Sequence, residues 1–323
     1  MKRNFLVFTL LASLILAAIY TTTTISTQSD KPGVATPVIL ASIKPVQLIV
    51  QAIVGDAATV ELLLSPATNP HHYQMRPSEV KKLHSADHFV WIGPGMEVFL
   101  PKVLASSTTP STALMDFVKG SDDHDDNPRQ ADNHANHGTM EEHHHDQDTL
   151  HEGSDPHIWL DPLLVVEISA ALAEELGHKY PQLQAEFINN QKEFSTSIEL
   201  LTNEFRVRLA KPEKRPVFTA HNAFSRLAER FNLHIQDFVT QSPELRPGAA
   251  HLQGLQNKIG SLTSICFIQE SPSPSTYLEM ITKSTEVKQV SVDILASNIL
   301  SDRNGYATLI YGVLSDIENC SRL

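Results

Sequence analysis

Residues 155–162 decide how this chain is organised, and they read Asp155-Pro156-His157-Ile158-Trp159-Leu160-Asp161-Pro162. The apolar centre of this octet is bounded by prolines, so we expect His157 to be held in one geometry. Asp161 can cap a helix that has Pro162 in its first turn. Apolar positions then recur at helical spacing as far as Leu176. We expect Gly177 to break this helix.

A second helix is predicted from about Pro181 to Ala210, ending before Pro212. A helix of about 30 residues would extend about 45 Å, which is longer than one small lobe. We therefore interpret residues 161–212 as connecting helices that join two lobes.

Apolar runs alternate with helical patterns on both sides of these helices. The strands are expected at 38–43, 60–64, 89–92, 113–118, 217–220, 233–239, 265–268 and 287–292. The helices between them are expected at 45–54, 76–85, 96–104, 222–231, 248–259, 274–283 and 306–319. This rhythm predicts an α/β fold of two lobes, 37–160 and 213–323, joined by a long rigid helix. Each lobe would hold a four-stranded, mostly parallel sheet flanked by helices.

The composition excludes some classes of partner and suggests export. A net charge of −12 argues against nucleic acid. Lys2 and Arg3 precede an apolar run from Phe5 to Tyr20, so residues 1–26 resemble an export signal. The alternative is a retained membrane anchor, although a spanning helix needs about 20 apolar residues. The chain's two cysteines, Cys266 and Cys320, fit an oxidising compartment, where such a pair usually forms a disulfide.

A tract rich in histidine and acid occupies residues 121–152. Its histidines are His124, His134, His137, His143, His144, His145 and His151. With almost no large apolar side chain the tract cannot form a core, so we expect a disordered loop. Its imidazoles suit zinc, copper and nickel, and its carboxylates concentrate divalent cations.

Four candidate metal ligands lie at or near the ends of predicted strands. They are His71, His157, His221 and Asp293. Ligands of open parallel sheets bind beyond the carboxyl ends of strands, so these side chains could meet between the lobes. The alternative is that they cap turns or face solvent. On spacing alone His72 is as available as His71.

Several motifs favour metal ligands over turn-capping or solvent-facing residues, because together they resemble one protein family. They are Asn69-Pro70-His71-His72-Tyr73 with Arg76-Pro77-Ser78-Glu79, Trp91-Ile92-Gly93-Pro94-Gly95-Met96-Glu97, the octet at 155–162, Phe218-Thr219-Ala220-His221-Asn222-Ala223-Phe224, and Ser242-Pro243-Glu244-Leu245-Arg246-Pro247-Gly248-Ala249. They resemble, in the same order, the zinc-specific periplasmic solute-binding proteins of ABC importers, the ZnuA family of the cluster A-I metal-binding proteins. The resemblance covers nearly the whole mature chain.

The resemblance implies the site, the partners and the location. His71, His157 and His221 would be the zinc ligands, Cys266 and Cys320 the family's disulfide, and the histidine tract its metal-gathering loop. The protein would be a periplasmic monomer that carries Zn(II) to a membrane permease, and no enzyme. Pro70 stands where some members have glutamate, so the fourth position stays open to Asp293, water or His72.

Three other functions remain as alternatives. Related manganese importers replace the third histidine with glutamate, whereas three imidazoles suit tetrahedral zinc, so His221 favours zinc over manganese or another divalent metal. An exported zinc hydrolase would also use three ligands and an activated water. However, the sequence has no HExxH helix and no obvious general base. A zinc buffer or an adhesin on the same fold is the third alternative.

Overall fold

The computed structural model of the chain describes residues 36–66, 68–118, 155–211, 214–243, 245–271, 277–282 and 285–323. The expected export signal at 1–26 and the histidine tract at 121–152 lie outside these described residues. Within Pro37–Leu323, which form one compact unit, the described helices include none that is long and apolar enough to cross a bilayer.

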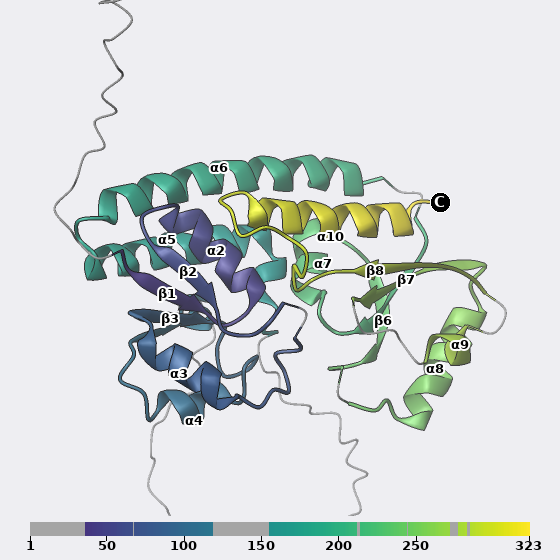
Figure 1. Cartoon of the computed structure of the whole chain (residues 1–323). Coiled ribbons are helices and arrows are strands. Elements are labelled where there is room, and N and C mark those ends of the chain that lie inside the picture. The colour runs from purple at the N-terminus through teal and green to yellow at the C-terminus, as the bar shows by residue number, and fades with distance from the viewer. Residues whose placement is uncertain are drawn as a thin grey trace, which may run out of the picture. The chain divides into compact units, whose positions relative to one another are not determined.

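The first sheet consists of four parallel strands in the order β2-β1-β3-β4 (Figure 1). The strands are β1 Val38–Ala41, β2 Thr59–Leu62, β3 His88–Trp91 and β4 Ser111–Ala113, and the helices between them are α2 Lys44–Val54, α3 Pro77–Ser85 and α4 Leu100–Leu104. The central strands β1 and β3 are buried almost throughout. Their continuous apolar runs are typical of parallel strands covered on both faces.

The second sheet repeats this topology. Its four parallel strands have the order β6-β5-β7-β8. They are β5 Val217–His221, β6 Ile235–Thr240, β7 Ser264–Glu270 and β8 Glu286–Val292, and the helices are α7 Ser225–Phe231, α8 Ala249–Gly260, α9 Leu278–Ile281 and α10 Gly305–Ser321. The predicted fold class, with two four-stranded sheets flanked by helices, is confirmed.

The largest differences between the expected and observed elements of the first sheet concern its fourth strand and the helix before that strand. The expected strand at 113–118 ends at Ala113, and the 3₁₀ helix η1 follows at Leu114–Phe117. An apolar run of this length does not by itself distinguish a strand from a buried turn. The expected helix at 96–104 begins only at Leu100. The preceding segment forms a turn instead, because the Glu97 carboxylate accepts hydrogen bonds from the backbone amides of Ile92 and Gly93.

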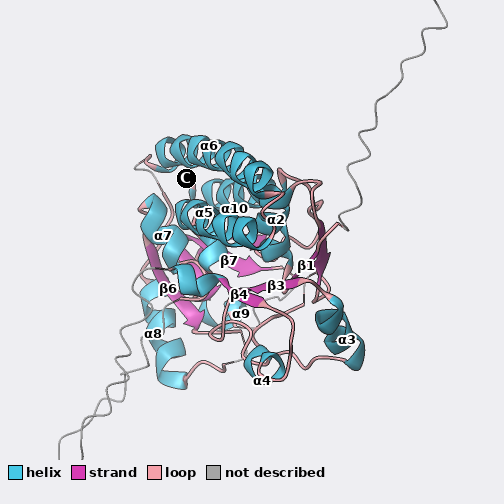
Figure 2. Cartoon of the chain, turned by 90° about the vertical axis from the view of Figure 1, so that its left-hand side faces the viewer, coloured by secondary structure: helices cyan, strands magenta, loops and turns pink. Residues whose placement is uncertain are grey.

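The connecting helices are α5 Pro162–Lys179 and α6 Gln184–Leu209. Asp161 caps α5, as expected, by accepting bonds from the amides of Leu163 and Leu164. The expected break at Gly177 is wrong, because α5 continues through it. A Cβ at Gly177 would lie 2.7 Å from Cγ of Gln184, so glycine here permits a close approach of α5 to α6. The 26 residues of α6 extend about 39 Å, and α6 runs along both sheets (Figures 1 and 2).

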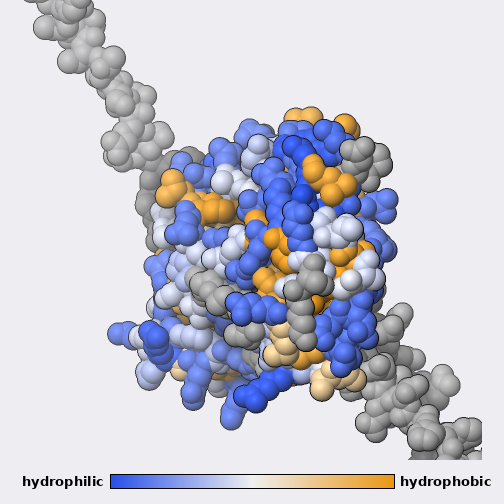
Figure 3. All heavy atoms as spheres, turned by 90° about the vertical axis from the view of Figure 1, so that its right-hand side faces the viewer, coloured by the Kyte–Doolittle hydropathy of each residue, from blue (hydrophilic) through white to orange (hydrophobic). Residues whose placement is uncertain are grey.

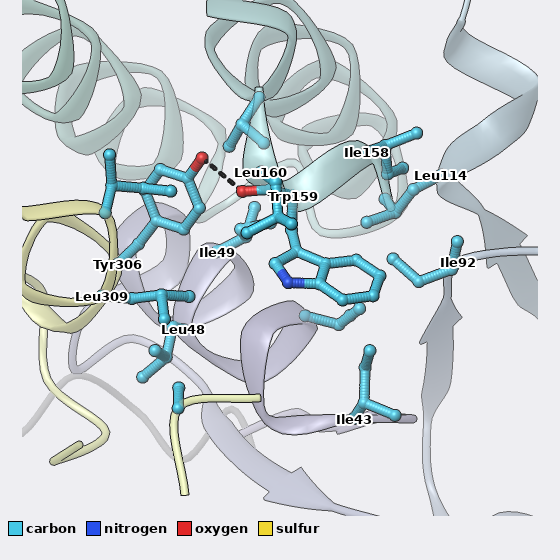
Figure 4. Close-up of a cluster of buried hydrophobic side chains, with 14 of the residues drawn as sticks. Ile43, Leu48, Ile49, Ile92, Leu114, Ile158, Trp159, Leu160, Tyr306 and Leu309 are labelled. Carbon is cyan, nitrogen blue, oxygen red and sulfur yellow. Dashed lines mark hydrogen bonds between the residues drawn. The ribbon is translucent and has the colours of Figure 1, made fainter. Parts of the chain in front are cut away.

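Trp159, at the centre of the octet, ties the connecting region to the second sheet. Its side chain is fully buried in an apolar cluster, beside Ile43, Ile49 and Ile92 (Figure 4). The Trp159 Nε1 donates to Ile294 O at 2.8 Å, and the Tyr306 hydroxyl donates to Trp159 O at 2.9 Å. These bonds fix the backbone next to His157.

The large exposed apolar side chains of the described residues belong to several separate elements. They are Val98, Leu200, Val207, Leu245, Met280, Leu300, Tyr311 and Leu323. On the face that carries α8 and α9, hydrophilic side chains predominate and interrupt the apolar ones (Figure 3). Scattered apolar residues of this kind are ordinary for a protein surface.

A buried histidine in β3 of the first sheet makes the fold sensitive to acid. His88 Nδ1 accepts a hydrogen bond from Lys179 Nζ at 2.9 Å, and His88 Nε2 lies 2.8 Å from the Thr112 hydroxyl, which donates to Glu175. Burial, with the charge of Lys179, lowers the pKa of His88 from 6.5 to about 4. The folded protein therefore binds fewer protons at His88 than the unfolded chain does as pH falls from 6.5 to 4.

We expect about 3 kcal/mol of stability to be lost at His88 between pH 6.5 and 4. Chemical unfolding as a function of pH checks this, with His88→Gln compared with the wild type. The substitution should lower stability at pH 7 and flatten the decline toward pH 4. The exposed histidine His178 provides the matched control, since His178→Gln should keep the wild-type slope. If the free energy of unfolding declined with falling pH equally steeply in the wild type and in His88→Gln, the expectation would be contradicted.

Candidate metal centre

Three imidazoles from distant parts of the sequence meet at one point. His71 lies in the loop between β2 and α3, His157 precedes the 3₁₀ helix η2 at Ile158–Leu160, and His221 is the last residue of β5. Nε2 of His157 lies 3.3 Å from Nε2 of His71 and 3.4 Å from Nε2 of His221. One ring nitrogen of each histidine lies within 4.8 Å of the other two.

This spacing matches the coordination of a small metal ion. Two nitrogens bound to one tetrahedral zinc at about 2.05 Å are about 3.3 Å apart. Bare lone pairs at this distance repel one another, so a cation between them would stabilise the arrangement. His157 and His221 are each only 3% exposed, and His71 is half-buried. The three side chains can therefore supply three of the four ligands of a tetrahedral site.

Carboxylates behind two of the histidines fix the ring orientation. His157 Nδ1 donates to Asp155 Oδ1 at 2.8 Å, and the His157 amide donates to the same oxygen at 3.0 Å. His221 Nδ1 lies 2.5 Å from Glu270 Oε2. A carboxylate only accepts hydrogen bonds, so each Nδ1 carries the proton and each Nε2 presents its lone pair to the cluster.

The ionised form of Asp155 is favoured at this position. Burial acts to raise its pKa, but the hydrogen bond with His157 and the charge of Arg226 outweigh burial and lower the pKa overall. Arg226, in α7, also contacts the segment that carries His157, because its Nε donates to Asp155 O at 2.7 Å. Loop residue His71 is held differently, since its amide donates to Asn69 Oδ1 at 2.9 Å.

Asp293 and His72 lie outside this group of ring nitrogens. The Asp293 carboxylate accepts bonds from the amide of Ser297 at 2.6 Å and from the Ser297 hydroxyl at 3.1 Å, and so it caps the turn after β8. His72 is exposed on the surface. The structure thus brings together His71, His157 and His221, but not Asp293 or His72.

Sequence reasoning missed Glu270, although a signal for it existed. Glu270 is the last residue of β7, and β7 pairs directly with β5, which ends at His221. Adjacent parallel strands bring their carboxyl ends to the same edge of the sheet. An acidic residue at the end of β7 was therefore placed to meet a histidine at the end of β5.

The histidines line a small cavity of about 50 Å³, whose wall also includes Trp159, Glu270 and Ile294. A larger hollow of about 580 Å³ lies near Lys214, Arg215 and Arg230 and includes none of the expected ligands. Volume alone would favour the larger hollow as the binding site. The convergence of three nitrogens places the candidate metal centre at the smaller one.

Known proteins resemble this chain over most of its length. The high-affinity zinc uptake system protein ZnuA of Yersinia pestis is 27% identical over 303 residues, covering 89% of this chain and 92% of the relative. The protein of the same name from Brucella abortus strain 2308 is 26% identical over 309 residues, covering 87% and 91%.

Solved structures share the fold. The AdcAII protein of Streptococcus pneumoniae has a TM-score of 0.69 at 22% identity and covers 89% of this chain and 100% of its own. The Mn²⁺ complex of FpvC from Pseudomonas aeruginosa also has a TM-score of 0.69 at 22% identity, with coverage of 88% and 98%. A family model described as zinc-uptake complex component A, periplasmic, matches residues 39–320. The chain therefore belongs to the ZnuA family of periplasmic zinc-uptake components.

Proposed function

We propose that this protein binds one Zn(II) ion through His71, His157 and His221 in the periplasm and delivers it to the permease of an ABC importer. The observation that carries the proposal is the Nε2 spacing of 3.3 and 3.4 Å around His157, which fits a tetrahedral zinc. Two relatives named as high-affinity zinc uptake proteins support zinc as the cargo.

The donor set favours zinc over manganese. Three neutral imidazoles with no carboxylate in the group suit zinc, whereas manganese prefers oxygen ligands and more of them. Copper(II) and nickel also accept nitrogen ligands, so they should compete with zinc in purified protein. Selection in the cell would then depend on which metal is available as well as on the site.

The position of the ligands suggests how loading is signalled. His71 and His157 belong to the first lobe, 37–160, and His221 belongs to the second, 213–323. A metal that joins the three would favour the closed arrangement of the lobes, which the permease then recognises. The connecting helices at 161–212 would keep the closure small. We propose that the protein acts as a monomer.

Titration calorimetry and metal competition test the proposal. The purified mature chain should bind zinc at one tight site and should release it little in the presence of a hundredfold excess of manganese. Equal affinity for the two metals would overturn zinc as the cargo. Failure of zinc loading to change the affinity for the permease would overturn delivery.

We propose an auxiliary role for the histidine tract, which gathers zinc weakly before the three histidines take it. Deleting residues 121–151 should lower the number of zinc ions bound while the affinity of the tight site stays within about threefold. Competition with a coloured chelator measures both quantities. Loss of the tight site on deletion would contradict the auxiliary role.

A further inference from the structure

The larger hollow, of about 580 Å³, has a basic wall. It lies where α6 ends, beside the first residues of β5 and β6 (Figure 1). The described side chains of its wall include no carboxylate, whereas the cationic ones are Arg206, Lys211, Lys214, Arg215 and Arg230. The whole chain has a net charge of −12, so this concentration of positive charge runs against the overall balance.

Most of these cations have no carboxylate to neutralise them. Arg230 is the exception, because its Nε and Nη2 both donate to the Asp161 carboxylate at 2.7 Å. Arg206 and Lys214 donate to uncharged oxygens, an amide side chain and a backbone carbonyl. Neither they nor Lys211 form an ion pair with a carboxylate in the described parts of the chain. Burial also lowers the pKa of Lys214, which shows that its charge is poorly compensated.

Arg215 contributes a buried donor without an acceptor. Its Nη1 donates to the backbone carbonyl of Arg322, and its Nη2 lies 3.9 Å from the Glu286 carboxylate, which is beyond hydrogen-bond distance. The Nε of Arg215 is buried and has no hydrogen-bond partner among the described residues. A buried donor without an acceptor is costly. Because Arg215 lines the hollow, an anion held there would compensate its guanidinium.

The size and the donors of the hollow indicate the class of anion. Its volume lies within the range of about 300–1,000 Å³ that is typical of small-molecule sites. A guanidinium group matches a phosphate with two parallel hydrogen bonds, and an ammonium group binds it as a point charge. At neutral pH a phosphate carries more charge than a carboxylate does and offers three acceptor oxygens. A phosphate therefore suits a cluster of several cations better than a single carboxylate.

We propose that this hollow is a binding site for phosphate-bearing anions, held by Arg206, Lys211, Lys214 and Arg215. A small soluble polyphosphate and the head group of an anionic phospholipid present the same chemistry to these four side chains. The site is separate from the metal centre. Val217 in its wall and the ligand His221 are the first and last residues of β5, about 13 Å apart.

Titration calorimetry with inorganic pyrophosphate tests the site. The mature chain is kept free of metal, so that chelation of zinc by pyrophosphate contributes no heat. We expect one saturable site at physiological salt, and the double variant Arg206→Glu with Lys211→Glu should bind at least about tenfold more weakly. Both side chains are exposed, so their reversal should not disturb folding. Equal affinity in the double variant and the wild type would overturn the proposal.

Lys81→Glu with Lys192→Glu is the matched control. These two lysines are also exposed, and their substitution changes the net charge by the same amount, but neither lines the hollow. The pyrophosphate affinity of this variant should stay within about twofold of the wild type. An equal loss of affinity in both double variants would mean that only the total charge matters and would also overturn the proposal.

Vesicles distinguish the two sources of phosphate. The wild type and both double variants are sedimented with vesicles of phosphatidylcholine, with and without phosphatidylglycerol. Pyrophosphate binding without vesicle binding assigns the hollow to a soluble anion. Binding to phosphatidylglycerol that only Arg206→Glu with Lys211→Glu abolishes assigns it to a lipid head group. A wild type that binds neither would overturn the proposal.

The zinc affinity of the same variants separates this inference from the proposed function. Reversing Arg206 and Lys211 should change the zinc affinity by less than about threefold, because the hollow lies at the other end of β5 from His221. A wild type that binds pyrophosphate but no zinc would overturn the proposed function and leave the anion site intact. A wild type that binds zinc but no phosphate-bearing anion would do the reverse.

Discussion

Replacing His157 with alanine is expected to weaken zinc binding at least about a hundredfold. His157 is the central ligand, because its Nε2 is the nitrogen close to both of the others. Structural zinc sites with four ligands bind with about 10–16 kcal/mol, or roughly 3 kcal/mol for each ligand. A loss of that size corresponds to more than a hundredfold in affinity. Competition with a chelator of known affinity measures the change.

The matched control for this substitution is His72→Ala. His72 is exposed and lies outside the group of ring nitrogens, so its loss should change the zinc affinity by less than about threefold. Removing the imidazole of His157 also takes its Nδ1 donor from the Asp155 carboxylate and leaves the backbone amide of residue 157 bonded to the same oxygen, which should destabilise the metal-free protein. Unfolding of the metal-free variants separates this effect from the loss of a ligand. A His157→Ala protein with the wild-type zinc isotherm would contradict the site.

Removing the disulfide is expected to lower the free energy of unfolding by about 4 kcal/mol. Cys266 in β7 and Cys320 in α10 form this bond across 54 residues, as predicted, and both are buried. Crosslinking a loop of this length restricts the unfolded chain, and the chain-entropy relation gives the figure of about 4 kcal/mol. The double variant Cys266→Ser with Cys320→Ser, unfolded in urea, tests the value.

Zinc binding should survive that double substitution in protein that is still folded. Cys266 lies four residues before Glu270 along β7, which is about 13 Å from the metal end of the strand. Reducing agent should destabilise the wild type and leave the double variant unchanged. A loss below about 1 kcal/mol would contradict the expected contribution of the bond. An equal effect of reductant on both proteins would point to a cause other than the disulfide.

The central strands were predictable because they are buried on both faces of their sheets. Runs such as Val38–Ala41 and Phe89–Trp91 are apolar without interruption, and flanking helical patterns set their order along the chain. The turn at 93–99 was not predictable in the same way. Its backbone amides are bound by the buried Glu97 carboxylate, and a pattern of apolar residues does not reveal such a bond.

The candidate site was predictable in part, for a similar reason. His221 and Glu270 follow from the rule that parallel strands end at one edge, although only His221 was identified. His71 and His157 lie in segments without regular structure, where periodicity carries no information, and the family resemblance singled them out. Asp293 satisfied the same rule as His221, but it turns to Ser297 instead, since a nearby amide and hydroxyl satisfy its oxygens.

The most direct test of the central claim is a crystal structure of the zinc-loaded protein with anomalous scattering recorded at the zinc edge. The account predicts one fully occupied peak between the lobes, about 2.0–2.1 Å from the Nε2 atoms of His71, His157 and His221. A principal zinc peak bound by fewer than two of these three histidines would contradict it.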